Sequence, residues 1–190
     1  MKLFLVTDIF GRTPALEAIG EELSHEVFDL EIVDPYEGTH HCFETEAAAY
    51  DHFMDLVGLK KYASILAETL PLFGPDIVLI GFSVGASAIW EVSDRSPFAH
   101  IKKAVCFYGS QIRQKTHLHP VFDIDLIFPK HEPHFDVDDL IRDLQRKDRI
   151  TCTKSKGLHG FMNKLSTHFD PACYTDCIRD LKASLAQLEI

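Results

Sequence analysis

Short apolar runs alternate with longer stretches of helical periodicity along the whole chain. Six short runs rich in Val, Ile, Leu and Phe predict buried β-strands. They cover residues 2–7, 27–33, 76–80, 104–108, 122–128 and 149–154. The stretches between them repeat apolar residues every three or four positions, as amphipathic helices do. This alternation predicts an α/β fold, a three-layer sandwich around a mostly parallel sheet of about six strands.

Helix start and stop signals mark the segments between the strands. Thr13 and Pro14 predict the start of the first helix, as a cap and a first-turn proline. A long helical region is expected over residues 44–73, ended by Gly74 and Pro75. Further helices are expected over residues 84–92, after a cap at Asp136, and from Asp170-Pro171 onward.

In open parallel sheets, functional groups gather at the carboxyl ends of the strands. This rule selects the segments to search for chemistry before any motif is considered. The segments are residues 8–11, 83, 108–110, 129–134 and 157–159.

Residues 81–85 read Gly-Phe-Ser-Val-Gly, a G-x-S-x-G pattern directly after a predicted strand and before a predicted helix. A nucleophile elbow requires this context, because its tight turn has no room for side chains two positions before and after the serine. We therefore predict Ser83 as the nucleophile, with a chance match in a turn as the alternative. The N–H of Val84, at a helix N-terminus, is placed to stabilise an oxyanion.

A serine nucleophile needs a base and an acid, which follow it in the chain order Ser, acid, His. His159 comes after the last predicted strand and is predicted as the base. Glu132 lies in the loop after the fifth strand and is predicted as the acid, with Asp136, which resembles a helix cap, as the alternative. Asp123 and Asp125, two residues apart within a strand, are interpreted as a solvated edge.

Composition and charge narrow the class of protein. The 190 residues fit one domain spanning 1–190, with 46% hydrophobic and 25% charged residues. The formal net charge of −10 disfavours nucleic acid and anionic membranes as partners. The apolar run at residues 3–6 is too short for a signal peptide, so we expect a cytoplasmic protein. Five cysteines without a C-x-x-C pair argue against a disulfide framework or a cysteine zinc site. The oligomeric state is left open.

Four short segments then carry a family resemblance. They are residues 8–11 (Asp-Ile-Phe-Gly), 82–86 (Phe-Ser-Val-Gly-Ala), 108–110 (Tyr-Gly-Ser) and 159–161 (His-Gly-Phe). Together, in this order and over nearly the whole chain, they resemble the dienelactone hydrolase family of α/β hydrolases. The resemblance implies the α/β-hydrolase fold.

The resemblance also implies residue roles. Ser83 stands at the nucleophile position, where dienelactone hydrolases themselves carry cysteine. His159 takes the position of the base and Glu132 that of the acid, where aspartate is usual. The oxyanion hole would consist of the backbone N–H groups of Ile9 and Val84.

A substrate pocket is expected near these residues. Asp8 falls where the family has a glutamate near the nucleophile. Phe10, Phe82 and Tyr108 lie at the same strand ends, together with Tyr36, and are candidate lining residues. Ordinary core aromatics are the alternative interpretation of these rings.

The predicted function is two-step acyl transfer to water. The substrate would be a small molecule with an ester, lactone or thioester bond, and a small peptidase activity is not separated from these by sequence. No cofactor is expected, because the chain has neither a phosphate loop nor a G-x-G-x-x-G motif. The alternative is a non-catalytic protein that binds a ligand or partner on the hydrolase fold.

A metal centre is the rival chemistry. Its candidate ligands are His117, His119, His131, Glu132 and His134. Their spacing matches no standard motif, so we expect no metal site.

Overall fold

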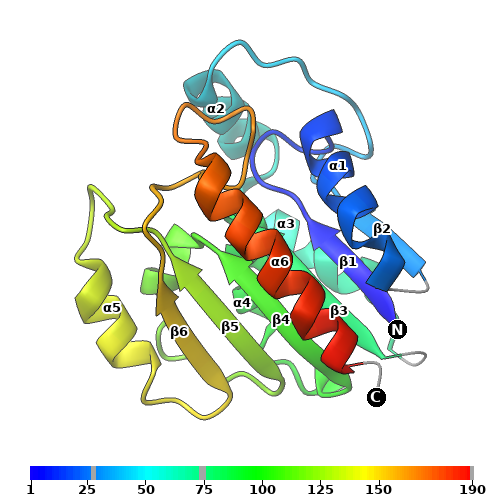
Figure 1. The fold of residues 1–190 in the computed structure, drawn as a ribbon, viewed down its shortest axis with the longest axis vertical. Coiled ribbons are helices and arrows are strands. Elements are labelled where there is room, and N and C mark those ends of the chain that lie inside the picture. The colour runs from blue at the N-terminus through cyan, green and yellow to red at the C-terminus, as the bar shows by residue number, and fades with distance from the viewer. Residues whose placement is uncertain (27–28, 73–75, 189–190) are drawn as a thin grey trace.

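The computed structural model describes residues 1–26, 29–72 and 76–188. Within them, six parallel strands form one sheet in the order β2-β1-β3-β4-β5-β6, with helices on both faces (Figure 1). The strands are β1 (Lys2–Val6), β2 (Asp29–Val33), β3 (Ile77–Phe82), β4 (Ile101–Phe107), β5 (Asp123–Phe128) and β6 (Ile150–Lys154). The three-layer α/β architecture expected from the sequence is confirmed.

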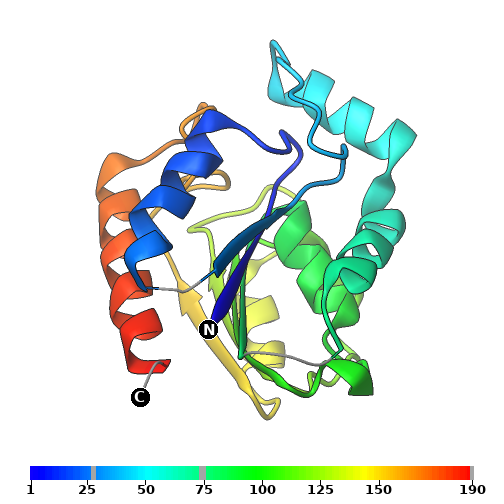
Figure 2. The ribbon, with the colours of Figure 1, turned by 90° about the vertical axis from the view of Figure 1, so that its right-hand side faces the viewer.

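The helices pack in two layers because side chains alternate along each strand. They are α1 (Pro14–Leu23), α2 (Glu46–Leu56), α3 (Gly58–Thr69), α4 (Val84–Val92), α5 (Val137–Leu144) and α6 (Pro171–Leu188). Leu3 and Leu5 of β1 join a core with α1 and α6, whereas Phe4 and Val6 join a second core with α3, α4 and α5. Figure 2 shows α1 and α6 on one side of the sheet and α3 and α4 on the other.

Strand β3 lies at the centre of the sheet, and all six of its residues are buried. Its register pairs Gly81 with Val6 of β1 and with Cys106 of β4. The carboxyl ends of these three strands are therefore level, and the loops that follow them meet at one edge of the sheet. This edge is where the candidate chemistry is found.

Two predicted elements differ from the structure by more than two residues. The helical region expected over residues 44–73 is two helices, because Val57 leaves the helical conformation (φ −126°, ψ −69°) and Gly58, the first residue of α3, is left-handed (φ 66°). Strand β4 begins at Ile101, three residues before the predicted start. Lys102 and Lys103 interrupt the apolar run there, but backbone pairing does not require apolar side chains. Residues 27–28 of the second predicted strand, and Phe73, Gly74 and Pro75 at the predicted helix end, lie outside the described residues.

Asp123 and Asp125 are solvated, as interpreted, but they do not lie at a sheet edge, because β5 lies between β4 and β6. Both carboxylates pair with cations, one on β4 and one directly before β6. Asp125 lies 2.6 Å from Lys103 Nζ, and Asp123 lies 3.1 Å from Arg149 Nη1. Across the described residues, no helix combines the length and the hydropathy needed to cross a bilayer.

Candidate active site

Ser83 sits in the turn that joins β3 to α4, in a strained backbone conformation. Its φ of 51° and ψ of −111° are rare for a residue with a side chain and cost about 1–3 kcal/mol. The flanking glycines permit the turn. A Cβ at Gly81 would lie 2.8 Å from the backbone nitrogen of Ala86, and one at Gly85 would overlap the carbonyl oxygens of Val6 and Thr7. The sterics expected of a nucleophile elbow are therefore present.

Ser83, His159 and Glu132 form a continuous chain of hydrogen bonds. Ser83 Oγ lies 3.0 Å from His159 Nε2, and His159 Nδ1 lies 2.7 Å from Glu132 Oε1. An ionised carboxylate only accepts hydrogen bonds, so Nδ1 carries the imidazole proton and Nε2 is left to accept from the serine hydroxyl. The structure thus brings together three side chains that lie far apart in the sequence.

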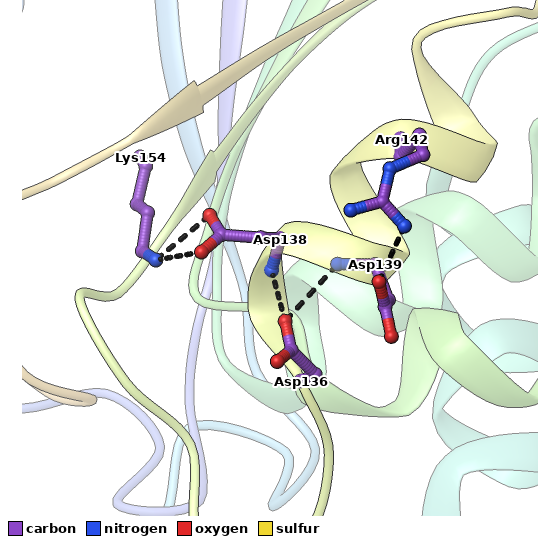
Figure 3. A network of polar contacts seen from close by, with 5 residues as sticks. All are labelled: Asp136, Asp138, Asp139, Arg142 and Lys154. Atoms are coloured by element: carbon purple, nitrogen blue, oxygen red, sulfur yellow. Dashed lines mark hydrogen bonds and ion pairs between the residues drawn. The ribbon is translucent and has the colours of Figure 1, made fainter.

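Glu132, and not Asp136, contacts the histidine. The Glu132 side chain is buried in the loop after β5, with 6% of its surface exposed. Asp136 is exposed and caps α5, where its carboxylate accepts hydrogen bonds from the N–H groups of Asp138 and Asp139 (Figure 3). These two hydrogen bonds lower the pKa of Asp136 below its usual value. Its neighbour Asp138 pairs with Lys154 at 2.8 Å, so this network belongs to the helix start.

The loop that carries His159 is held from several sides. Gly160 has a φ of 90°, which allows the chain to turn directly after the histidine. The ring of Tyr108 packs against the imidazole with 5.0 Å between ring centroids. The exposed His168 lies 3.2 Å from the carbonyl oxygen of His159, and thus contacts the backbone of the loop.

Two residues near the serine have a backbone N–H group without a hydrogen-bond partner among the described residues. Val84 is the first residue of α4, so its N–H has no partner within the helix. Among the described residues, the N–H of Ile9 has no hydrogen-bond partner either. The Ile9 segment is fixed because the Tyr36 hydroxyl donates to the Ile9 carbonyl at 2.7 Å and Phe10 N–H donates to Asp8 at 2.9 Å. Ile9 and Val84 line one cavity with Ser83, so these N–H groups are the candidates for an oxyanion hole.

Asp8 links the end of β1 to the histidine loop. Its Oδ2 accepts a hydrogen bond from Asn163 Nδ2 at 2.6 Å, across 155 positions of sequence. Burial raises the pKa of Asp8 to about 6, against the hydrogen bonds from Phe10 and Asn163, which favour the charged form. Sequence reasoning missed Asn163, because a single asparagine four residues after a histidine matches no motif.

A cleft of about 570 Å³ opens over Ser83, and residues of two helical segments line it. On one side, α2 contributes Tyr50 and Met54, each nearly half exposed. On the other, the short 3-10 helix Ser110–Gln114 contributes Gln111 and Arg113. None of these four residues was singled out from the sequence, since helix packing alone brings them to the serine.

Three of the four predicted pocket residues line a second, smaller cavity at the serine. Asp8, Phe10 and Tyr108 line a separate pocket of about 50 Å³ that also touches Ser83. Phe82 lines an adjoining cavity of about 10 Å³, away from the serine. Phe10, Phe82 and Tyr108 are each at most 7% exposed, because they pack beneath the strand ends. In the described ranges, no group of three or more His, Cys, Asp or Glu side chains is arranged to hold a metal ion.

Comparison with known proteins gives one sequence relative and a set of similar structures. No protein-family model matches the chain. The uncharacterized protein YczH of Bacillus subtilis (strain 168) is 30% identical over 186 residues, which cover 95% of this chain and 90% of that protein.

Three solved structures share the fold at low sequence identity. A dienelactone hydrolase-like promiscuous phosphotriesterase from metagenomic libraries has a TM-score of 0.67 at 11% identity, covering 98% of this chain and 86% of that chain. A cold-adapted esterase from an Arctic intertidal metagenomic library has a TM-score of 0.63 at 12% identity, covering 96% of this chain and 82% of the esterase chain. An esterase of Pyrobaculum calidifontis has a TM-score of 0.59 at 14% identity, covering 100% of this chain and 76% of the esterase chain. The chain therefore has the α/β-hydrolase fold.

Proposed function

The chain belongs to the family of YczH of Bacillus subtilis and has the α/β-hydrolase fold, and from this premise we propose that it is a serine hydrolase. Its substrate is a small molecule with an ester, lactone or thioester bond. Cleavage proceeds through an acyl-enzyme on Ser83, with His159 as base and Glu132 as acid. The observation that carries the proposal is the hydrogen-bonded chain from the Ser83 hydroxyl through the imidazole to the buried Glu132 carboxylate.

The first half-reaction forms the acyl-enzyme. His159 Nε2 removes the Ser83 hydroxyl proton while Oγ attacks the carbonyl carbon. The tetrahedral oxyanion accepts hydrogen bonds from the N–H groups of Ile9 and Val84, of which each is worth roughly 3 kcal/mol in sites of this kind. The imidazolium then passes its proton to the leaving oxygen or sulfur, and the bond to the leaving group breaks.

The second half-reaction releases the acid. Water replaces the leaving group, His159 takes a proton from it, and the resulting hydroxide attacks the acyl carbon. Collapse of the second tetrahedral intermediate returns the proton to Ser83 Oγ. Glu132 stays ionised throughout, holds the imidazole in the required tautomer and stabilises its charged form.

Labelling and turnover test the nucleophile directly. Purified protein is treated with a fluorescent fluorophosphonate and with short-chain p-nitrophenyl esters, beside Ser83→Ala and the exposed-helix control Ser64→Ala. We expect labelling and turnover in the wild type and in the control, and loss of both in Ser83→Ala. A wild-type protein that folds but neither labels nor turns over would contradict the proposal and favour a ligand-binding role on the same fold.

A further inference from the structure

Two cavities of very different size meet at Ser83. The large cleft of about 570 Å³ is shared by Ser83, Val84, Glu132 and His159. The small pocket of about 50 Å³ also touches Ser83 and His159, but lies against the end of β1 and the histidine loop. Any acyl substrate bound at the serine directs one group into each cavity. The two sizes therefore bear on which substrates fit.

The small pocket admits only a few atoms. A cavity needs roughly 10–15 Å³ on the same measure to hold one water molecule. About 50 Å³ thus accommodates roughly three to five groups of that size. An acetyl or propionyl group fits this space, whereas the six carbons of a hexanoyl chain exceed it.

A polar wall closes the far end of the pocket. Asp8, Tyr108 and Asn163 line both the small pocket and the adjoining cavity of about 10 Å³, so they form the partition between the two. Both polar atoms of the Asn163 side-chain amide are hydrogen-bonded. Its Nδ2 donates to Asp8 at 2.6 Å, and its Oδ1 accepts from the N–H of Leu165 at 2.8 Å.

The chemistry of the wall also disfavours alkyl chains. The Tyr108 hydroxyl is buried and has no hydrogen-bond acceptor among the described residues, and the backbone N–H of Met162 is the polar group near its oxygen. A methylene placed against the hydroxyl would exclude water and leave the hydroxyl proton without an acceptor, which is costly in a buried site. Behind the wall the surroundings turn apolar, with Leu16, Ile19 and Met162 lining the adjoining cavity. A longer chain would find an apolar space only if the wall were opened.

We infer that the small pocket is the acyl site and that Asp8, Tyr108 and Asn163 restrict the enzyme to acyl groups of about two or three carbons. The leaving group lies in the large cleft, between Tyr50 and Met54 on one side and Arg113 on the other. The acyl group stays bound to Ser83 after the first half-reaction, whereas the leaving group must depart, and the wide cleft offers the route. This inference rests on the proposed function.

Truncation of the wall tests the inference. The measurement is kcat/KM for p-nitrophenyl acetate, propionate and hexanoate in wild type, Asn163→Ala and the milder Asn163→Ser. One misfitting methylene changes kcat/KM by about 10- to 200-fold in a tight pocket. We expect the wild type to favour acetate over hexanoate by at least about tenfold. Both truncations should raise the hexanoate-to-acetate ratio by about tenfold.

Two controls separate size from loop disruption. Asn163→Leu keeps the number of side-chain atoms but loses both hydrogen bonds of the amide, so the hexanoate-to-acetate ratio should stay near wild type even if both rates fall. Leu165→Ala truncates an exposed residue of the same loop that lines neither cavity, and should leave the ratio unchanged. Thermal melting confirms that each variant is folded.

The outcomes distinguish the acyl-site inference from the proposed hydrolase function. A ratio that does not rise in folded Asn163→Ala or Asn163→Ser overturns the acyl-site inference while leaving the hydrolase proposal intact. The same holds if the ratio rises equally in Asn163→Leu, or if a series of acetate esters shows that alcohol length is what the small pocket limits. A wild type that hydrolyses none of the esters contradicts the proposed function itself.

Discussion

At the scale of single residues, the proposed chemistry depends on the proton of the His159 ring. The buried Glu132 carboxylate at 2.7 Å holds that proton on Nδ1 and so leaves Nε2 free to accept from Ser83. An amide in place of the carboxylate would present a donor or an uncharged acceptor, and both weaken this preference. Asp136 has no such role, since its carboxylate is occupied by the first turn of α5.

Glu132→Gln should therefore lower kcat by about 10³- to 10⁴-fold with little change in KM, because the tautomer and the imidazolium both lose support. Steady-state kinetics on a p-nitrophenyl ester measures this. Asp136→Ala is the matched comparison. It removes a helix cap and should reduce the free energy of unfolding by about 0.5–2 kcal/mol while leaving kcat unchanged. A large loss of kcat in Asp136→Ala and none in Glu132→Gln would reverse the assignment.

Asp8 gives a prediction on pH. Burial raises its pKa to about 6 from the ordinary value of 3.8, so the folded protein binds the proton more tightly than the unfolded chain. The ionisation of Asp8 consequently reduces stability as pH rises from about 4 to about 6, and the reduction is complete above that range. Asp8→Asn removes this titration.

The free energy of unfolding of Asp8→Asn minus that of the wild type should therefore increase between pH 4 and pH 7. The total increase should be about 1–3 kcal/mol, whatever pH-independent loss the altered hydrogen bonds cause. Urea unfolding at a series of pH values measures it. A difference that stays flat across this range, or decreases, would show that the Asp8 pKa is not raised.

At the scale of elements, the junction between β3 and α4 sets the position of the nucleophile. The junction is tight because α4 begins directly at Val84 and packs its first turn against the end of β1. Gly85 is the point of closest approach. Its missing side chain is what lets the helix start lie on the carbonyl groups of Val6 and Thr7.

Gly85→Ala should reduce the free energy of unfolding by about 3 kcal/mol or more, since backbone and not a flexible side chain blocks the new Cβ. Gly58→Ala is the control for left-handed strain alone. Gly58 has a φ of 66° and open space around it, so the same change should cost only about 1–2 kcal/mol. Chemical denaturation compares the two. Equal losses in the free energy of unfolding would mean that close packing around Gly85 adds no cost beyond backbone strain.

At the scale of the whole molecule, the sheet separates two hydrophobic cores, one on each face. The face covered by α1 and α6 contains Leu181 and Leu185 at 4% and 2% exposure. It meets the site through Tyr108 and through Phe161 of the histidine loop, whose ring centroids lie 5.3 Å apart. Substitutions in this core far from the carboxyl-terminal edge of the sheet should therefore change the free energy of unfolding without changing kcat.

Leu185→Ala, near the end of α6, should reduce the free energy of unfolding by about 2–5 kcal/mol and leave kcat unchanged below the melting temperature. Leu56→Ala, at a residue 58% exposed, should change stability by less than about 0.5 kcal/mol. Denaturation curves and esterase assays on the same preparations check both. A fall in kcat for folded Leu185→Ala would mean that the far core also tunes the site.

The sequence by itself determined the layered α/β architecture and the segments that carry the candidate chemistry. Apolar runs and helical periodicity are local properties, and the G-x-S-x-G spacing reflects sterics within five residues. The order of nucleophile, acid and histidine along the chain then selected Ser83, Glu132 and His159, whose catalytic roles stay predictions. Glu132 was distinguished from Asp136 because the cap pattern at a helix start is also local.

Only the tertiary structure decided what surrounds the serine. The Asp8–Asn163 hydrogen bond spans 155 positions, and the walls of the cleft come from α2 and from the 3-10 helix after β4. Asp8, Phe10 and Tyr108, three of the four residues expected to line the pocket, border a small cavity that touches Ser83, and Phe82 borders the cavity behind it. The break between α2 and α3 at Val57 and the internal position of β5 were decided in the same way. Each depends on how helices and strands pack across the sheet, and no spacing along the chain encodes that packing.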